Sequence, residues 1–359
     1  MAPSDNDFQT TGWRARGAAL AAARRDPGAP RRWAVTGPIV LDCDPGLDDA
    51  VALQYALGTG RYDIKAVTAV GGNAPVEHTY RNARSLVKTF GMAGRIPVYR
   101  GVGGRLTRRI EAPSAFDFHG ETGFGVEPAD DEGVPEQREN AVEALLRLSR
   151  EHAGELTVVA TGPLTNIAAA LLTDPSFAER IRLIFMGGAV SEPGNVTPVA
   201  EFNIWHDPEA ADLVVASGVD FTMVGLDATH RARFTLDHLA RLEAAGEPLE
   251  FTVRLLKYYF GSYNHFHRAD SVPLHDPLAV GAALDPEFLK TTEGTVFVES
   301  GSPLTAGQTV FLRAEDTAGT SLPPQLTERA RGSRGKVALE LGPRDFVEEF
   351  TSVLERWGR

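Results

Sequence analysis

The 359-residue chain has only one cysteine, Cys43, which excludes an intrachain disulfide framework and predicts a reducing compartment, the cytoplasm. It lacks an apolar run long enough to span a bilayer. It also lacks a stripe of basic residues interleaved with aromatics, and its net charge is -12. These absences argue against nucleic acid as a partner and against docking on anionic membranes.

Residues 1–36 have few large apolar side chains. The segment RARGAALAAARRDPGAPRR is rich in Ala and Arg and has no apolar core of the kind that a secretory signal needs. An Arg-rich organelle-targeting helix is the alternative, and we expect a disordered or loosely docked extension. Residues 37–359 are predicted to form a single domain, since 43% hydrophobic content is ample for a large core.

Strand and helix patterns alternate beyond Gly37. This alternation predicts an α/β fold, an open and mainly parallel, Rossmann-like sheet with helices on both faces. Ligands of such sheets bind beyond the carboxyl ends of the strands. The predicted strands are 39–44, 64–70, 96–101, 155–162, 180–188 and 220–229, and the predicted helices are 49–60, 76–92, 139–154, 163–175, 207–218 and 275–284.

Four acidic residues crowd the end of the first predicted strand, in the string PIVLDCDPGLDDA: Asp42, Asp44, Asp48 and Asp49. Carboxylates this close repel one another, so a fold that gathers them needs a cation or raised pKa values. Oxygen ligands select Ca²⁺ or Mg²⁺ over zinc. A solvated acidic turn, or helix N-terminal charges, would explain one or two of these residues but not Asp42 and Asp44, which lie on or just after an apolar strand. We therefore predict a metal site.

Further polar residues follow other predicted strands or begin a helix. Each one alone could be a turn residue or a helix cap. Their common placement at the carboxyl edge of the predicted sheet instead predicts one site. The residues are Asn73, Thr161, Asn195, Glu201, Asn203, His275 and Asp276.

The strings DCDPGLDDA, ATGPLTN, MGGA with GNVTPVAEFN, and HDP occur in this order along the chain. Because of these four strings, residues 37–359 resemble the inosine-uridine-preferring nucleoside hydrolase family. The resemblance implies an open α/β fold and a catalytic Ca²⁺ at its carboxyl edge. It also implies hydrolysis of the N-glycosidic bond of ribonucleosides to ribose and free base by an Asp-activated, metal-bound water. Members are usually homodimers or homotetramers.

The resemblance also implies roles for individual residues. Asp44 would be the general base and His275 the acid that protonates the leaving base. Asp42 would support the loop. The implied Ca²⁺ ligands are Asp44, Asp49, the main-chain carbonyl of Thr161 and Asp276, and the implied substrate-binding residues are Asp48, Asn73, His119, Met186, Asn195, Glu201, Phe202, Asn203, Tyr259 and Tyr263.

Two other functions remain open. An Asp-x-Asp sequence at a strand end also occurs in Mg²⁺-dependent phosphotransferases and phosphatases, although such enzymes need a hydroxyl and a lysine at later strand ends. A non-catalytic nucleoside- or ribose-binding protein could keep the calcium pocket, but the presence of both Asp44 and His275 argues against it. The segment around Tyr259 and Tyr263 could be a plain amphipathic helix.

Overall fold

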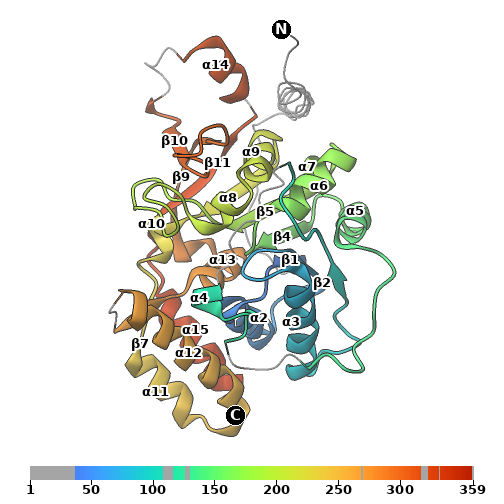
Figure 1. The fold of residues 1–359 in the computed structure, drawn as a ribbon, viewed down its shortest axis with the longest axis vertical. Coiled ribbons are helices and arrows are strands. Elements are labelled where there is room, and N and C mark those ends of the chain that lie inside the picture. Colours follow the sequence, from blue (N-terminus) through green and yellow to red (C-terminus); the bar gives the residue numbers. More distant parts are fainter. Residues whose placement is uncertain are drawn as a thin grey trace.

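The computed structural model describes residues 37–107, 116–125, 130–267, 270–316, 322–330 and 332–357, so the predicted extension lies outside the described residues. Nine of the eleven described strands form one sheet in the order β10-β9-β11-β6-β5-β4-β1-β2-β3 (Figure 1). The strands are β1 (Pro38–Cys43), β2 (Asp63–Ala69), β3 (Val98–Arg100), β4 (Leu156–Ala160), β5 (Ile181–Met186), β6 (Asp220–Val224), β9 (Leu289–Val298), β10 (Thr309–Arg313) and β11 (Arg334–Leu341).

The sheet is parallel from β3 through to β11, and β9 and β10 add two antiparallel strands at one edge. The predicted open, mainly parallel α/β sheet is confirmed; the antiparallel edge was not predicted. Strand β1 pairs with β2 on one side and with β4 on the other, so the strand order reverses there. This reversal opens a crevice at the carboxyl ends of β1 and β4, where ligands of open α/β sheets bind.

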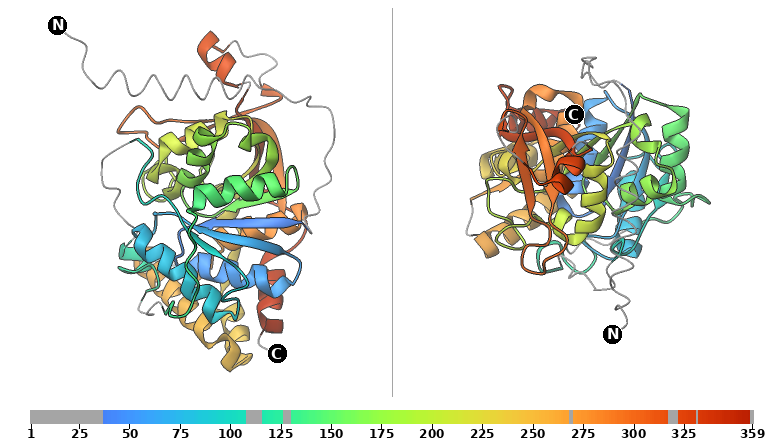
Figure 2. Two further views of the ribbon diagram at one scale, coloured as in Figure 1. Left: turned by 90° about the vertical axis from the view of Figure 1, so that its right-hand side faces the viewer. Right: turned by 90° about the horizontal axis from the view of Figure 1, so that it is seen from above.

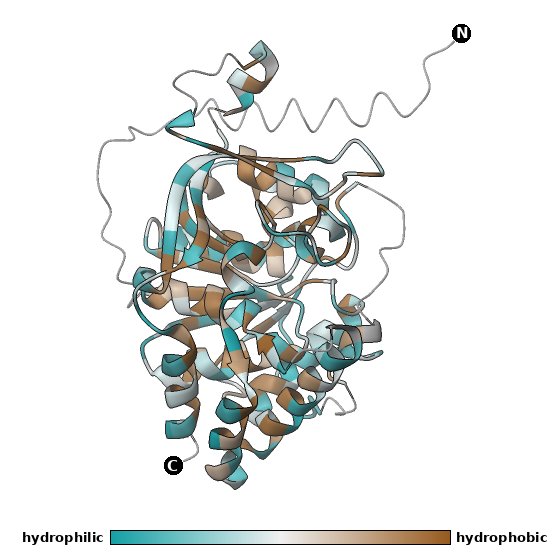
Figure 3. Ribbon diagram, turned by 90° about the vertical axis from the view of Figure 1, so that its left-hand side faces the viewer, coloured by the Kyte–Doolittle hydropathy of each residue, from teal (hydrophilic) through white to brown (hydrophobic). Residues whose placement is uncertain are grey.

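Alternate side chains of β1 enter two separate cores. Ile39 and Leu41 pack with α2, α3, α12, α13 and α15, whereas Val40 packs with α5, α6, α7 and α9. Figure 2 shows the sheet between these two helical layers, and hydrophobic residues concentrate where helices face it (Figure 3). The helices named here are α2 (Leu47–Thr59), α3 (Val76–Thr89), α5 (Ala141–Glu151), α6 (Thr165–Thr173), α7 (Phe177–Arg180), α9 (Pro208–Ala216), α12 (Glu250–His267), α13 (His275–Leu284) and α15 (Phe346–Trp357).

Shorter elements join these layers. Strands β7 and β8 form a two-stranded antiparallel ribbon, in which β7 follows α10 and β8 lies between α12 and α13. The connecting elements are α4 (Phe116–His119), α8 (Phe202–His206), α10 (Leu226–Thr229), β7 (Arg233–Thr235), α11 (Leu236–Ala244), the 3₁₀ helices η1 (Glu247–Leu249) and η2 (Pro286–Phe288), β8 (Ser271–Pro273) and α14 (Pro324–Ala330). No helix in the described part of the chain combines the length and apolar character needed to cross a bilayer.

The predicted strand over residues 220–229 is wrong in its second half, because β6 ends at Val224 and α10 follows. The Leu226 N–H donates to the carbonyl of Gly188 at 2.8 Å and so leaves the ladder. Gly225 lies at this crossing, where a Cβ atom would stand 2.6 Å from the same Gly188 oxygen. Close backbone approach ends the strand here, which strand propensity alone does not report.

Candidate active site

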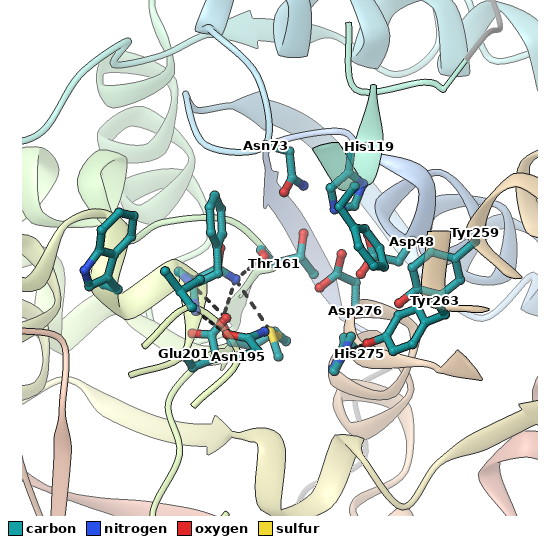
Figure 4. Close-up of a pocket in the computed structure, with 16 residues that line it drawn as sticks. Asp48, Asn73, His119, Thr161, Asn195, Glu201, Tyr259, Tyr263, His275 and Asp276 are labelled. Carbon is teal, nitrogen blue, oxygen red and sulfur yellow. Dashed lines mark hydrogen bonds between the residues drawn. The ribbon is translucent and has the colours of Figure 1, made fainter. Parts of the chain in front are cut away.

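A cavity of about 290 Å³ opens beyond the carboxyl ends of β1, β4 and β5 (Figure 4). Every predicted substrate-binding residue lines it, together with Thr161, His275 and Asp276. The sheet therefore brings together residues that lie more than two hundred positions apart in the chain. The lining residues are Asp48, Asn73, Phe118, His119, Thr161, Met186, Asn195, Val196, Glu201, Phe202, Asn203, Trp205, Tyr259, Tyr263, His275 and Asp276.

Three buried carboxylates form one group, of which Asp48 and Asp276 line the floor of this cavity. One ligand atom from each of Asp48, Asp49 and Asp276 lies within 4.8 Å of the others. Asp48 and Asp49 belong to the first turn of α2 and Asp276 to the first turn of α13, two helices that pack together. The partial positive charge of two helix N-termini offsets part of the repulsion among the carboxylates.

Burial and mutual repulsion perturb these carboxyl groups strongly. Burial, then the Asp49 charge, raises the pKa of Asp48 to about 7. Burial and the charges of Asp48, Asp49 and Asp44 raise the pKa of Asp276 well above its usual range. Asp48 Oδ1 is buried and has no hydrogen-bond partner among the described residues. An unsatisfied carboxylate oxygen beside two further carboxylates fits a hard divalent cation, which binds oxygen ligands.

Asp44 lies at the end of β1, next to this group. Its Oδ2 accepts the N–H of Asn73 at 2.7 Å, and its charge contributes to the raised pKa of Asp276. A Cβ atom on Gly72 would stand 2.0 Å from Asp44 Oδ2, and one on Gly162 would stand 2.7 Å from Oδ1. The two glycines are therefore required for the backbone to enclose this carboxylate, a role that the sequence analysis did not assign to them.

Asp49 and Thr161 connect the carboxylate group to β4. Asp49 accepts hydrogen bonds from the Thr161 hydroxyl at 2.7 Å and from the N–H of Gly46 at 3.0 Å. The Thr161 carbonyl, predicted as a metal ligand, accepts a hydrogen bond from Asn203 Nδ2 at 2.7 Å. A carbonyl oxygen has two lone pairs, so this bond leaves one for a cation.

Asp42 lies beneath this group rather than in the cavity. Its Oδ1 accepts hydrogen bonds from the Thr68 hydroxyl at 2.5 Å and from Asn166 Nδ2 at 2.8 Å, which tie β1 to β2 and α6. Burial raises the pKa of Asp42 to about 7. These contacts agree with the predicted supporting role.

The short helix α8 organises one side of the cavity. Glu201 caps its N-terminus by accepting the N–H groups of Asn203 at 2.9 Å and Ile204 at 3.2 Å, and it also accepts that of Gly188 at 3.0 Å. Asn195 Oδ1 accepts the Phe202 N–H at 2.9 Å. These bonds fix the loop of residues 187–201, between β5 and α8, so that the Asn195 and Glu201 side chains line the cavity.

The opposite side of the cavity is aromatic. Phe118 packs edge-on against Tyr263 and Tyr259, with ring centroids 5.0 Å and 5.6 Å away. The Tyr263 hydroxyl lies 2.9 Å from His275 Nε2, and the Thr229 hydroxyl lies 2.8 Å from Nδ1. Both nitrogens of the histidine are thereby held, which fixes the ring in one orientation (Figure 4).

The two histidines of the site are uncharged at neutral pH. Burial, with smaller effects of His230, Arg233 and His119, lowers the pKa of His275 well below its usual range. Burial alone lowers the pKa of His119 to about 4, and its Nδ1 accepts the N–H of Leu47 at 3.3 Å. The cavity therefore combines carboxyl groups that a bound cation would keep ionised with imidazole, amide and hydroxyl groups that donate or accept hydrogen bonds.

Several lining residues were missed from the sequence: Phe118, Val196, Trp205 and, behind His275, Thr229. Phe118 directly precedes His119, and Trp205 follows Asn203 by two positions on α8. An apolar side chain beside a polar motif is more often part of a core, so no sequence signal separated these residues from ordinary packing.

Comparison with known proteins identifies the family. The family model described as "Inosine-uridine preferring nucleoside hydrolase" matches residues 39–347. The chain belongs to this family. Its curated relatives include the pyrimidine-specific ribonucleoside hydrolase RihA of Escherichia coli O9:H4 (strain HS), which is 40% identical over 276 residues, 76% of this chain and 88% of the relative. RihA of Salmonella enteritidis PT4 has the same identity and coverage.

Solved structures support the same assignment. The plant nucleoside hydrolase PpNRh1 aligns with a TM-score of 0.81 and 30% identity, covering 90% of this chain and 99% of its own. A purine-preferring ribonucleoside hydrolase from Gardnerella vaginalis aligns with a TM-score of 0.80 and 28% identity, and the alignment covers 89% of this chain and 99% of that structure. The predictions of the family, its fold and a hydrolase of N-glycosyl bonds are confirmed.

Proposed function

We propose that the protein is a Ca²⁺-dependent hydrolase of inosine- and uridine-type ribonucleosides, which releases ribose and the free base. The observation that carries this proposal is the arrangement of one cavity. Buried carboxylates lie at its floor, amide and carboxylate side chains at one side, and an aromatic cluster with a doubly held histidine at the other.

The carboxylates fit the proposed ion. Asp44, Asp49, the Thr161 carbonyl and Asp276 would hold Ca²⁺, and the group of Asp48, Asp49 and Asp276 supports adding Asp48 to these ligands. Ca²⁺ accepts about six to eight oxygen ligands, so ribose hydroxyls and water can complete the set. When bound, the ion would supply the positive charge that favours ionised carboxylates, orients the sugar diol and acidifies a water molecule.

Asp44 is the proposed general base. Cleavage of the bond between C1′ and the base nitrogen develops positive charge on the sugar and negative charge on the base. Asp44 would accept a proton from the attacking water through the carboxylate oxygen that the Asn73 N–H does not occupy. Direct attack of water gives inversion at C1′ without a covalent intermediate.

His275 is the proposed proton donor to the departing base, whose developing negative charge would favour the protonated form of the buried ring over the neutral form of the resting site. The Tyr263 and Thr229 hydroxyls hold its two nitrogens, so the ring needs no reorientation during the reaction. Phe118, Tyr259 and Tyr263 offer ring faces and edges against which a planar base can pack.

The amide side chains suit the ribose. A sugar hydroxyl both donates and accepts, and Asn73, Asn195 and Asn203 can do either, with Glu201 as an acceptor. A site built around these hydroxyls leaves polar groups unpaired when one is missing. We therefore expect 2′-deoxyribonucleosides to react about 10⁴-fold more slowly.

The assembly and location of the protein complete the proposal. We expect a cytoplasmic homodimer or homotetramer, in keeping with the family resemblance and with the single cysteine. Light scattering on the purified full chain measures the subunit number.

A reducing-sugar assay over a panel of ribonucleosides, with and without a chelator, tests the proposed function. Calcium-dependent release of ribose from inosine and uridine is the expected result. Phosphatase activity with a phospho-aspartate at Asp42 or Asp44 would instead establish the phosphotransferase, although no lysine lines the described part of the cavity. Ribose or nucleoside binding without base release would establish a binding protein.

A further inference from the structure

A second cavity, of about 430 Å³, is lined by residues of β7, α11, the start of α15 and the segment before it. It shares no lining residue with the active-site cavity. We call it the arginine cavity, and its lining residues are Arg231, Arg233, His238, Leu341, Gly342, Pro343, Arg344, Asp345, Phe346 and Val347.

Two of its arginines have no carboxylate partner among the described residues. Arg231 donates Nε to the carbonyl of Asp227 at 2.9 Å. Arg233 donates Nε to the Ser271 hydroxyl at 3.1 Å and another nitrogen to the Ser271 carbonyl. Arg344, by contrast, is paired with Asp285. Each unpaired guanidinium thus keeps donors that these hydrogen bonds do not use.

The unpaired arginines do not result from a shortage of acidic residues. The chain has 48 Asp and Glu against 36 Lys and Arg, and other described arginines, such as Arg147 and Arg241, each pair with two carboxylates. Arg231 is exposed and Arg233 is half-buried, so an anion can reach both guanidinium groups from solvent without displacing a carboxylate.

His238 and α15 add further donors to the same cavity. His238 Nδ1 accepts the N–H of Thr235 at 3.0 Å, so the ring proton lies on Nε2, which is then a donor. The first turn of the twelve-residue α15 contributes Phe346 and Val347. Asp345, a carboxylate in the lining, already caps Glu348 N–H at 3.1 Å.

We propose that the arginine cavity binds a phosphate dianion, as inorganic phosphate or as the phosphate of a small monoester, with Arg231 and Arg233 as its principal ligands. A guanidinium presents donors in a planar fork that matches two phosphate oxygens. The cavity has room for more than a bare phosphate group, so the monoester is the expected ligand and binds more tightly than the free ion.

Isothermal titration calorimetry on the full chain tests this proposal. The probes are inorganic phosphate and glycerol 2-phosphate, which lacks a vicinal diol, and a chelator removes calcium. Arg231→Gln should weaken both probes about tenfold, because a charge-assisted hydrogen bond contributes roughly that factor. Arg95→Gln is the matched control, since Arg95 is exposed and lies outside both cavities. Tighter binding of inorganic phosphate than of the monoester would identify the free ion as the ligand.

Arg233 also donates hydrogen bonds to Ser271 on β8, so a variant at Arg233 can lose stability. The test therefore uses Arg231→Gln. Protection from phenylglyoxal, mapped by peptide mass spectrometry, provides a second measurement: phosphate should protect Arg231 and Arg233 but not Arg95. Nucleoside hydrolysis should be unchanged in Arg231→Gln, so this test is independent of the proposed function. Equal affinities of wild type and Arg231→Gln, absence of millimolar binding by the wild type, or no selective protection would each overturn the proposal.

Discussion

Replacing Asp276 by asparagine should stabilise the calcium-free protein and remove its response to calcium. Asp276 is buried with Asp48 and Asp49, and its raised pKa reflects burial and their charges. Asparagine keeps the size of the side chain but cannot ionise. The substitution therefore removes a repulsion that the protein experiences only when no cation is bound.

The size of the effect follows from the geometry. The ligand atoms of the group lie within 4.8 Å of one another, and two unit charges at this upper limit repel by about 3.5 kcal/mol at an effective dielectric constant of about 20. Protonation of one carboxyl group relieves part of this repulsion, so we expect a gain of about 1–3 kcal/mol near pH 8. For a chain of this size, each kcal/mol shifts the melting temperature by roughly 2 °C. The wild type should gain about 2.7 kcal/mol from calcium at one hundred times its Kd, and the variant should gain almost nothing.

The pH dependence gives a further check. A folded-state pKa above the usual 3.8 means that the folded wild type binds more protons than the unfolded chain. The stabilisation of the wild type that this proton provides is complete below pH 3.8 and is lost as the pH rises. The melting temperature of calcium-free Asp276→Asn should therefore exceed that of the wild type by a margin that grows from pH 4 to pH 8.

Thermal unfolding with chelator and with calcium measures these shifts. Asp227→Asn is the control, because Asp227 is buried and lies outside the group of Asp48, Asp49 and Asp276. Asp227 accepts the N–H groups of Val190 and Ser191 at 2.8 and 2.7 Å, so its substitution should lower the melting temperature. A lower melting temperature of calcium-free Asp276→Asn, with the calcium response intact, would refute the reasoning.

Three further predictions concern catalysis and acid stability. Asp44→Asn should lower kcat about 10²–10⁴-fold with a smaller change in KM, and near-normal turnover in steady-state assays would exclude it as the base. His275→Ala should slow inosine far more than p-nitrophenyl riboside, whose leaving group needs no proton; equal losses would exclude a proton donor. Burial and the Arg105 charge lower the pKa of His206 to about 4. The free energy of unfolding should therefore fall by about 3 kcal/mol as the pH drops from 6.5 to 4, because the unfolded chain binds this proton first. Chemical unfolding should show that His206→Gln loses less of its free energy of unfolding over this pH range than the wild type, and an equal loss would contradict this.

The order of strands and helices could be read from the sequence because each has its own hydrophobic period. Ile39, Val40 and Leu41 form a continuous apolar run, which is typical of a strand buried on both faces. The error at Leu226–Thr229 arose because the carbonyl of Gly188, from a distant segment, accepts the N–H that would have extended the strand. No strand was predicted over β9 and β10, and the direction of β9 depends on its antiparallel pairing with β11, which the local residue pattern does not specify.

Positions in the cavity could be predicted where a motif marked a strand end. Asp48 shows the limit: the family resemblance associated it with the ribose hydroxyls, and the structure places it in the cavity lining and also beside Asp49 and Asp276, which the sequence did not predict. Adjacent residues on a helix point in different directions, so the group that each one joins depends on the element packed against that helix. Here that element is α13.

The sequence by itself determined the alternation of elements, the acidic end of β1 and the residue types available at the carboxyl edge, because these follow from local pattern and covalent order. Only the tertiary structure decided which carboxylates share a site, which aromatic rings face them, and that two arginines remain unpaired around a second cavity. Those properties depend on distances between segments remote in the chain, and packing of the folded chain alone sets them.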